Sequence, residues 1–173
     1  ALLSSLFFLI LPFAFFRLER APWKKTLSRL GFFQKTSLLE TLRVAVFCFA
    51  ALFVSLLILG FAFAPFLDTG PALERIRNLS LSLLILAVTL GPLGEEVFFR
   101  GFLQPQLGVV LTSFLFGLLH SVFSSPLEGV AAFVASLILG YFYRKYANLY
   151  ASILAHAVYN ASSLLLVLGL GLK

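Results

Sequence analysis

The stretch Gly91-Pro-Leu-Gly-Glu-Glu-Val-Phe-Phe-Arg100 sets two adjacent glutamates in the middle of an apolar part of the chain. The segment that leads into it, from Leu79 onward, consists mostly of leucine and other apolar residues. An ionisable side chain at membrane depth costs about 2.5–3.5 kcal/mol on insertion scales, and such residues tend to mark function. Packing does not explain Glu95 and Glu96, so we expect them to belong to a site inside a membrane.

The composition of the whole chain supports a membrane protein. Hydrophobic residues make up 61% of the 173 residues and charged residues 12%, whereas soluble domains are about 45–50% apolar and about 25% charged. The net charge of +6 comes from basic residues beside apolar segments, which fits loops that face anionic headgroups better than a nucleic-acid surface. The single cysteine, Cys48, excludes an intramolecular disulfide.

Six apolar segments predict an all-α transmembrane helical bundle of about six spans, because backbone groups in lipid must be satisfied within a helix. The bundle forms one integral-membrane domain, residues 1–173. The chain begins at Ala1 and contains no methionine, so we expect the true N-terminus to lie upstream and the first segment to be truncated. The predicted spans are Leu2–Phe16, Val44–Leu67, Leu79–Gln104, Val109–Phe123, Val130–Tyr143 and Tyr150–Leu172.

The basic segment Arg17–Arg43 follows the first span. It carries seven Lys and Arg residues interleaved with Trp23, Leu27, Leu30 and Phe33, which predicts an amphipathic helix lying in the membrane interface; the alternative is a plain basic loop. With Arg100, Arg144 and Lys145, six alternating spans place ten of the thirteen Lys and Arg residues on this side. The positive-inside rule makes it cytoplasmic.

Helical rise gives each polar residue a depth above the cytoplasmic turns. At 1.5 Å per residue, Glu95 lies about 15 Å, His120 about 18 Å, His156 about 12 Å and Asn160 about 18 Å from the nearest such turn. Three helices that enter from the same side therefore bring their polar residues to one level, and we expect the site to open to the cytoplasm.

Spacing along each helix suggests roles for these residues. Glu96 and Arg100 are i,i+4 with the acid first, which favours an intrahelical ion pair; Glu95 points about 100° away on the helix and remains free for chemistry. Phe116 can wall the pocket of His120 by the same spacing. A histidine or Asn160 taken alone could equally be an interhelical hydrogen bond, but all of them at one depth favour a site.

Three motifs in order carry a resemblance to a known family. They are Glu95-Glu96-Val-Phe-Phe-Arg100, Phe116-Gly-Leu-Leu-His120 and His156-Ala-Val-Tyr-Asn160. The chain resembles the CPBP family (CAAX proteases and bacteriocin-processing enzymes, also called type II CAAX prenyl endopeptidase-like or Abi) over a core motif region, residues 79–170. The stretch between Arg100 and Phe116 is short, which leaves little room for a substrate-contacting loop.

The resemblance implies an intramembrane glutamic endopeptidase of a prokaryotic cell membrane. By the family's scheme, Glu95 and His120 would activate a water while His156 and Asn160 would hold the oxyanion. No metal and no cofactor are implied, and the partners would be the lipid bilayer and a membrane-embedded or prenylated protein or peptide. Nothing in the sequence identifies that substrate.

Two other functions compete with this one. Glu95, His120 and His156 could form a His₂Glu zinc site with an open position for water, although the His-Glu-x-x-His spacing of many zinc proteases is absent and Asn160 would have no role. A non-catalytic membrane scaffold subunit is the other alternative, which the intact motifs argue against.

Overall fold

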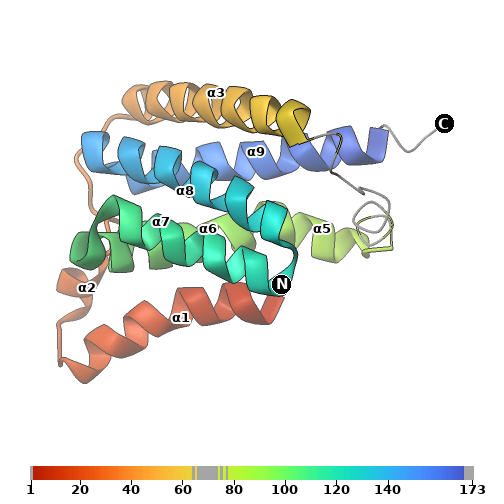
Figure 1. Cartoon of the computed structure of the whole chain (residues 1–173). Coiled ribbons are helices and arrows are strands. Elements are labelled where there is room, and N and C mark those ends of the chain that lie inside the picture. Colours follow the sequence, from red (N-terminus) through yellow and green to blue (C-terminus); the bar gives the residue numbers. More distant parts are fainter. Residues whose placement is uncertain (1, 64, 66–73, 75, 77, 170–173) are drawn as a thin grey trace.

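The computed structural model describes residues 2–63, 65, 74, 76 and 78–169, with side chains from residue 6 onward. Every regular element in these ranges is a helix, which confirms the predicted all-α class. The described elements are α1 (Leu2–Leu18), α2 (Trp23–Arg29), α3 (Leu38–Phe63), α5 (Leu81–Val88), α6 (Leu90–Glu96), the π-helix η2 (Val97–Leu103), α7 (Gln104–Phe123), α8 (Pro126–Tyr146) and α9 (Leu149–Gly169). Figure 1 shows them as a bundle between α3 along one edge and α1 along the other.

Several helices are long and apolar enough to cross a membrane. Among the described residues they are Leu38–Phe63, Leu81–Phe123, Pro126–Tyr146 and Leu149–Gly169, with Leu6–Leu18 as a shorter apolar helix. The chain is therefore an integral membrane protein with a helical bundle, as its composition predicts.

The stretch Leu81–Phe123 contains two of the predicted spans. A straight helix of its 43 residues would be about 65 Å long, roughly twice the hydrocarbon thickness of a bilayer. Gly108 interrupts it with φ 77° and ψ 172°, a backbone conformation that glycine adopts without strain. In Figure 1, α6 runs toward one end of the bundle, and α7 runs back from that same end.

A break also separates α5 from α6. Thr89, between them, has φ −120° and ψ −76°, and its hydroxyl donates a hydrogen bond of 2.7 Å to the Ile85 carbonyl. Pro92, in the first turn of α6, has no N–H to continue the helical ladder. The interruption leaves backbone carbonyls of α5 available to side chains of other helices.

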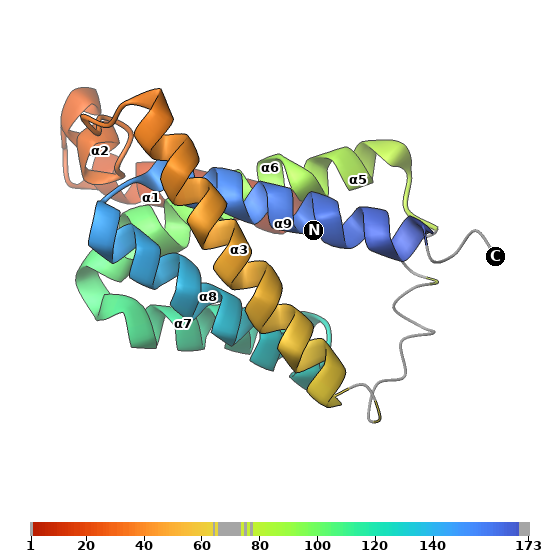
Figure 2. The same ribbon diagram turned by 90° about the horizontal axis from the view of Figure 1, so that it is seen from above.

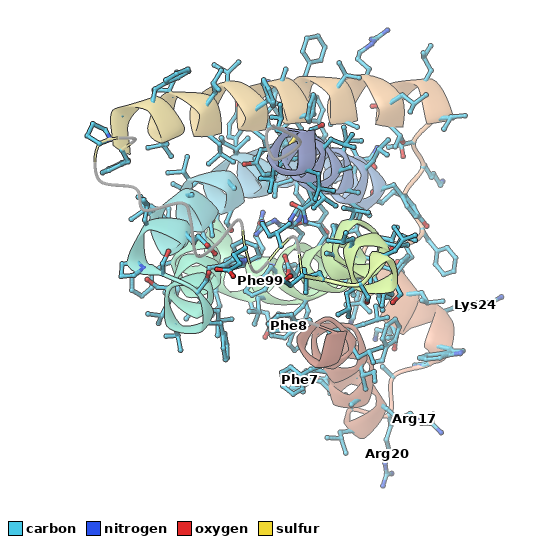
Figure 3. The ribbon with its side chains drawn as sticks, turned by 90° about the vertical axis from the view of Figure 1, so that its right-hand side faces the viewer. Phe7, Phe8, Arg17, Arg20, Lys24 and Phe99 are labelled. Atoms are coloured by element: carbon cyan, nitrogen blue, oxygen red, sulfur yellow. The ribbon has the colours of Figure 1, made fainter. Side chains whose placement is uncertain are left out.

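Exposed basic residues gather at one end of the bundle, which we call the basic face. They are Arg17, Arg20, Lys24, Lys25, Arg29, Lys35, Arg43, Arg144 and Lys145. Figure 3 shows Arg17, Arg20 and Lys24 pointing away from the helices. Arg100, which the sequence analysis counted with these cations, is fully buried and gives no information about orientation. Arg75, Arg77 and Lys173 lie outside the described residues.

The predicted interfacial helix is only partly formed. Its helical part, α2, has seven residues, and Leu30, the residue after it, is fully buried. A Cβ atom placed on Gly101 in η2 would lie 2.6 Å from the Leu30 carbonyl oxygen. The basic segment therefore packs its backbone against η2 instead of lying along the membrane surface throughout.

Helix α1 covers another side of the same π-helix. The Phe8 ring lies 5.0 Å from that of Phe98 and 5.4 Å from that of Phe99. Figure 3 places Phe8 beside Phe99 while Phe7 points outward. These contacts and that of Leu30 with Gly101 cover two sides of η2.

Close packing of α7 on α8 sets the register of the two helices. A Cβ atom on Gly117 would lie 2.7 Å from the Gly129 carbonyl oxygen, and one on Gly129 would lie 2.5 Å from Ser121 Oγ and 2.9 Å from the Gly117 carbonyl oxygen. Small residues let membrane helices approach in this way. Gly129 consequently lies between the levels of Gly117 and Ser121.

The helix α3 closes the remaining side. In Figure 2 it crosses α8 and α9 diagonally. Its buried residues Cys48 and Leu52 pack with Leu139 of α8 and Ala155 of α9. A cavity of about 180 Å³ lies between the end of α3, the start of α8 and Tyr159 of α9.

Candidate active site

The two adjacent glutamates lie in different surroundings. The side chain of Glu96 is 0% exposed and that of Glu95 is 21% exposed. Successive residues of a helix are rotated by about 100°, so one carboxylate faces the packed interior and the other faces a cavity. Their environments, described next, differ accordingly.

Glu96 is paired inside the bundle. Its Oε2 lies 3.1 Å from Arg100 Nε, and both side chains are fully buried. Arg100 also donates from Nη1 to Ser136 Oγ on α8 over 3.0 Å, and its guanidinium lies 5.7 Å from the centre of the Phe116 ring. This is the ion pair expected from the i,i+4 spacing, placed at the start of a π-helix, an element frequent at functional sites.

His156 connects the two glutamates. Its Nδ1 lies 3.0 Å from Glu96 Oε1, and its Nε2 lies 3.7 Å from Glu95 Oε2. Because an ionised carboxylate only accepts hydrogen bonds, Nδ1 carries a proton in this contact. The i,i+4 spacing predicts only Arg100 as a partner of Glu96. The contact with His156 spans 60 residues and leaves no signal in local spacing.

His120 is held by its own helix. Its Nδ1 lies 2.9 Å from the Phe116 carbonyl oxygen, and its ring centre lies 4.4 Å from that of Phe116. A carbonyl oxygen can only accept, so Nδ1 is the donor and Nε2 of the neutral ring keeps a lone pair. The geometry leaves His120 able to accept a proton.

Asn160 is anchored at the break between α5 and α6. Its Nδ2 donates a hydrogen bond of 3.2 Å to the Ala87 carbonyl, one of the carbonyls near the interrupted ladder. An amide group has a second N–H and a carbonyl oxygen, so this contact leaves hydrogen-bonding capacity for a ligand.

One cavity brings these residues together. It has a volume of about 220 Å³ and lies between α3, α6, α7, α8 and α9. Glu128 is the charged residue of the lining that the three motifs do not include. The lining residues are Leu52, Leu56, Glu95, Phe116, His120, Glu128, Ala131, Ala132, Ala135, Leu139, His156, Tyr159 and Asn160.

The lining differs from one end of the cavity to the other. Leu52, Leu139 and Phe116 are buried. Glu128 is exposed and lies in the first turn of α8, at the opposite end of that helix from Arg144 and Lys145. The exposed end of the lining, which we call the mouth of the cavity, is the end away from the basic face.

The zinc alternative finds no support in the geometry. In the part of the chain that the structure describes, no group of three or more His, Cys, Asp or Glu side chains is arranged to hold a metal ion. Glu95, His120 and His156 line one cavity without forming such a group.

Comparison with known proteins identifies the family. Residues 77–162, about half of the chain, match the family model described as type II CAAX prenyl endopeptidase Rce1-like. No curated protein matches the chain, and no solved structure matches it. The matched region contains all three motifs, and the match confirms the family recognised from them.

Proposed function

The chain belongs to the Rce1-like family of type II CAAX prenyl endopeptidases, and from this premise we propose that it is an intramembrane glutamic endopeptidase. In this proposal Glu95 and His120 activate the attacking water, and His156 and Asn160 hold the oxyanion. The observation that carries it is the cavity of about 220 Å³ that all four side chains line.

The chemical step uses a base and two hydrogen-bond donors. Glu95 or His120 Nε2 accepts a proton from water, and the hydroxide attacks the scissile carbonyl carbon. The tetrahedral intermediate collapses when the same proton passes to the departing nitrogen, which breaks the C–N bond and leaves a carboxylic acid and an amine; the acid then gives its proton to the amine or to water. Positioned bases of this kind contribute about 10²–10⁴-fold in rate.

The oxyanion would accept hydrogen bonds from Asn160 and His156. The Asn160 amide keeps one N–H beyond its contact with Ala87. The Nδ1–H of His156 already faces Glu96, so donation from Nε2 requires the doubly protonated ring. Glu95 and Glu96, on either side of the ring, would balance that charge.

Glu96 and Arg100 support the site without touching the substrate. Glu96 accepts from His156 through one oxygen and pairs with Arg100 through the other. Carboxylates that hold a histidine in this way fix its tautomer and orientation. We assign Glu96 and Arg100 as positioning residues and Phe116 as the wall between His120 and Arg100.

The orientation in the membrane follows from the basic face. We propose that this face lies in the cytoplasm of a prokaryotic cell, by the positive-inside rule. The predicted cytoplasmic opening of the site conflicts with that orientation, because the exposed end of the cavity at Glu128 lies opposite the basic face. The lining favours access from the far side of the membrane.

Thiol labelling distinguishes these orientations. Single cysteines at Gln106, beside the basic face, and at Ser124, in the exposed turn after α7, are placed on a Cys48→Ala background. An impermeant reagent added to intact cells should label Ser124→Cys and not Gln106→Cys. The reverse pattern would put the basic face outside and the cavity mouth in the cytoplasm.

Activity itself is tested by comparing membranes that contain the wild-type protein or Glu95→Ala. We expect peptides whose cleavage disappears in the variant, and these define the substrate as a membrane-embedded or prenylated protein. Cleavage should survive exhaustive chelation. Identical peptide patterns would favour the scaffold function, and activity lost on chelation and restored by zinc would favour the metalloenzyme.

A further inference from the structure

Glu128 is the acidic residue of the cavity lining that the proposed mechanism does not use. Gly129 lies between the levels of Gly117 and Ser121 on α7, so Glu128 lies close to the level of His120 on the neighbouring helix. The Glu128 side chain is exposed, yet it lines the cavity that holds His120 and Glu95. A carboxylate is therefore present at the mouth, one helix away from the reacting groups.

A second cavity begins at the same carboxylate. It has a volume of about 180 Å³ and shares Leu56, Glu128, Ala131 and Tyr159 with the first cavity. The rest of its lining is apolar and comes from the end of α3 and the start of α8: Leu59, Gly60, Phe63, Leu127 and Val130. A peptide that occupies both cavities would lie in the apolar groove at one end and beside the catalytic residues at the other. Glu128 would lie between these two parts of the peptide.

Helix capping accounts for the backbone of Glu128 but leaves its carboxylate free. Ser125 Oγ accepts a hydrogen bond of 3.2 Å from the Glu128 N–H, as in a capping box. Among the described residues, no hydrogen bond or ion pair engages the carboxylate in return. The side chain is available to a ligand.

We propose that Glu128 selects peptide substrates that carry a Lys or Arg side chain close to the scissile bond, next to apolar residues that fill the α3–α8 groove. This inference rests on the proposed peptidase function and names the substrate class of its site. A carboxylate recognises a cationic side chain by charge and by accepting its N–H donors. The apolar lining on either side recognises the flanking residues.

The chain offers a matched control for this carboxylate. Glu40 lies in the first turn of α3, and its N–H donates to Ser37 Oγ over 3.2 Å, the same capping contact that Glu128 makes with Ser125. Glu40 is exposed and lines neither cavity. The Glu40→Gln variant removes a charge from the same capping position as Glu128→Gln does, but it leaves the mouth of the cavity unchanged.

The test uses apolar fluorogenic peptides in detergent, with Lys, Gln or Glu placed in turn at each position. For the wild-type protein we expect kcat/KM to favour Lys over Gln at one position by about 3- to 10-fold, the range of a partly exposed charge pair. Glu128→Gln should bring that ratio to about one and leave cleavage of the Gln peptide unchanged. Glu128→Lys should favour the Glu peptide, and Glu40→Gln should behave as the wild type.

Two results would overturn the inference while leaving the peptidase intact: a Lys preference that persists in Glu128→Gln, or an equal loss in Glu40→Gln. If the wild type cleaves no peptide, the proposed function fails, and the affinity for peptides then tests the role of Glu128 separately. Labelled Lys and Gln peptides are then titrated onto Glu95→Gln protein with and without Glu128→Gln. A Kd difference of about 3- to 10-fold that needs Glu128 supports the inference, and equal Kd values refute it.

Discussion

Two adjacent residues of one helix belong to two different regions. Glu95 lines the cavity, whereas Glu96 belongs to the buried set Glu96, Arg100 and Ser136, which we call the sealed layer. In the cavity, Glu95 is partly exposed and faces His156 at 3.7 Å. In the sealed layer, Glu96 and Arg100 are fully buried, and Arg100 donates a hydrogen bond to Ser136 on α8. One peptide bond therefore separates a carboxylate that lines a cavity from one that only the protein touches.

This difference shows that two equal charges in a membrane can meet different physical demands. A buried ion must be paired, because an isolated charge in a low-dielectric interior is costly. Glu96 meets that demand through Arg100 and His156. Glu95 is partly exposed, lines the cavity and has only the longer contact with His156.

Glu95→Gln gives the sharpest expected contrast between the two regions. The substitution preserves size but removes a base from the cavity, so peptide cleavage should fall by about 10²–10⁴-fold or more. The melting temperature in detergent should barely change, since the side chain is not part of the sealed layer. Substantial cleavage by purified Glu95→Gln protein would remove Glu95 from the mechanism.

Glu96→Gln should instead act on stability first. It leaves Arg100 as a buried cation without its counter-ion, and breaking a buried pair in this way costs about 3–5 kcal/mol in soluble proteins. Thermal unfolding in detergent should show a large drop, with Glu40→Gln as the exposed control. Some activity should also be lost because His156 loses its anchor. A stable but inactive Glu96→Gln, together with an active Glu95→Gln, would exchange the two roles.

Asn160→Ala tests the proposed oxyanion donor in the cavity lining. Removing one oxyanion donor should lower kcat by about 10²–10³-fold. The lost contact with the Ala87 carbonyl should lower stability only slightly. If the melting temperature falls while kcat is unchanged, Asn160 supports the break between α5 and α6 and does not bind the oxyanion.

Gly101→Ala probes the packing around the sealed layer and has the smallest expected effect. The added Cβ would lie 2.6 Å from the Leu30 carbonyl oxygen, and overpacking of this kind costs about 1–3 kcal/mol. Gly60→Ala is the matched control, because nothing lies within 4 Å of its added Cβ. Denaturation curves that show equal stability for both variants would mean that the basic segment is not packed against η2 as described.

Local patterns predicted the helical class, the helical segments and the Glu96–Arg100 spacing, because hydropathy and i,i+4 periodicity are properties of one segment. They did not predict the contact of His156 with Glu96 or the presence of Glu128 in the cavity. Both depend on the packing of α8 and α9 against distant helices, which residue spacing within one helix does not record. The burial of Leu30 was missed for the same reason, since its partner Gly101 lies in another part of the chain.

The reversal at Gly108 also fixes the parity of membrane crossings. If Leu81–Phe123 were counted as a single crossing, everything from α8 onward would be assigned to the wrong side of the bilayer. A reporter fused after α9 would then be expected in the compartment opposite to its real one. One glycine with a positive φ thus decides on which side every later loop of this protein meets water.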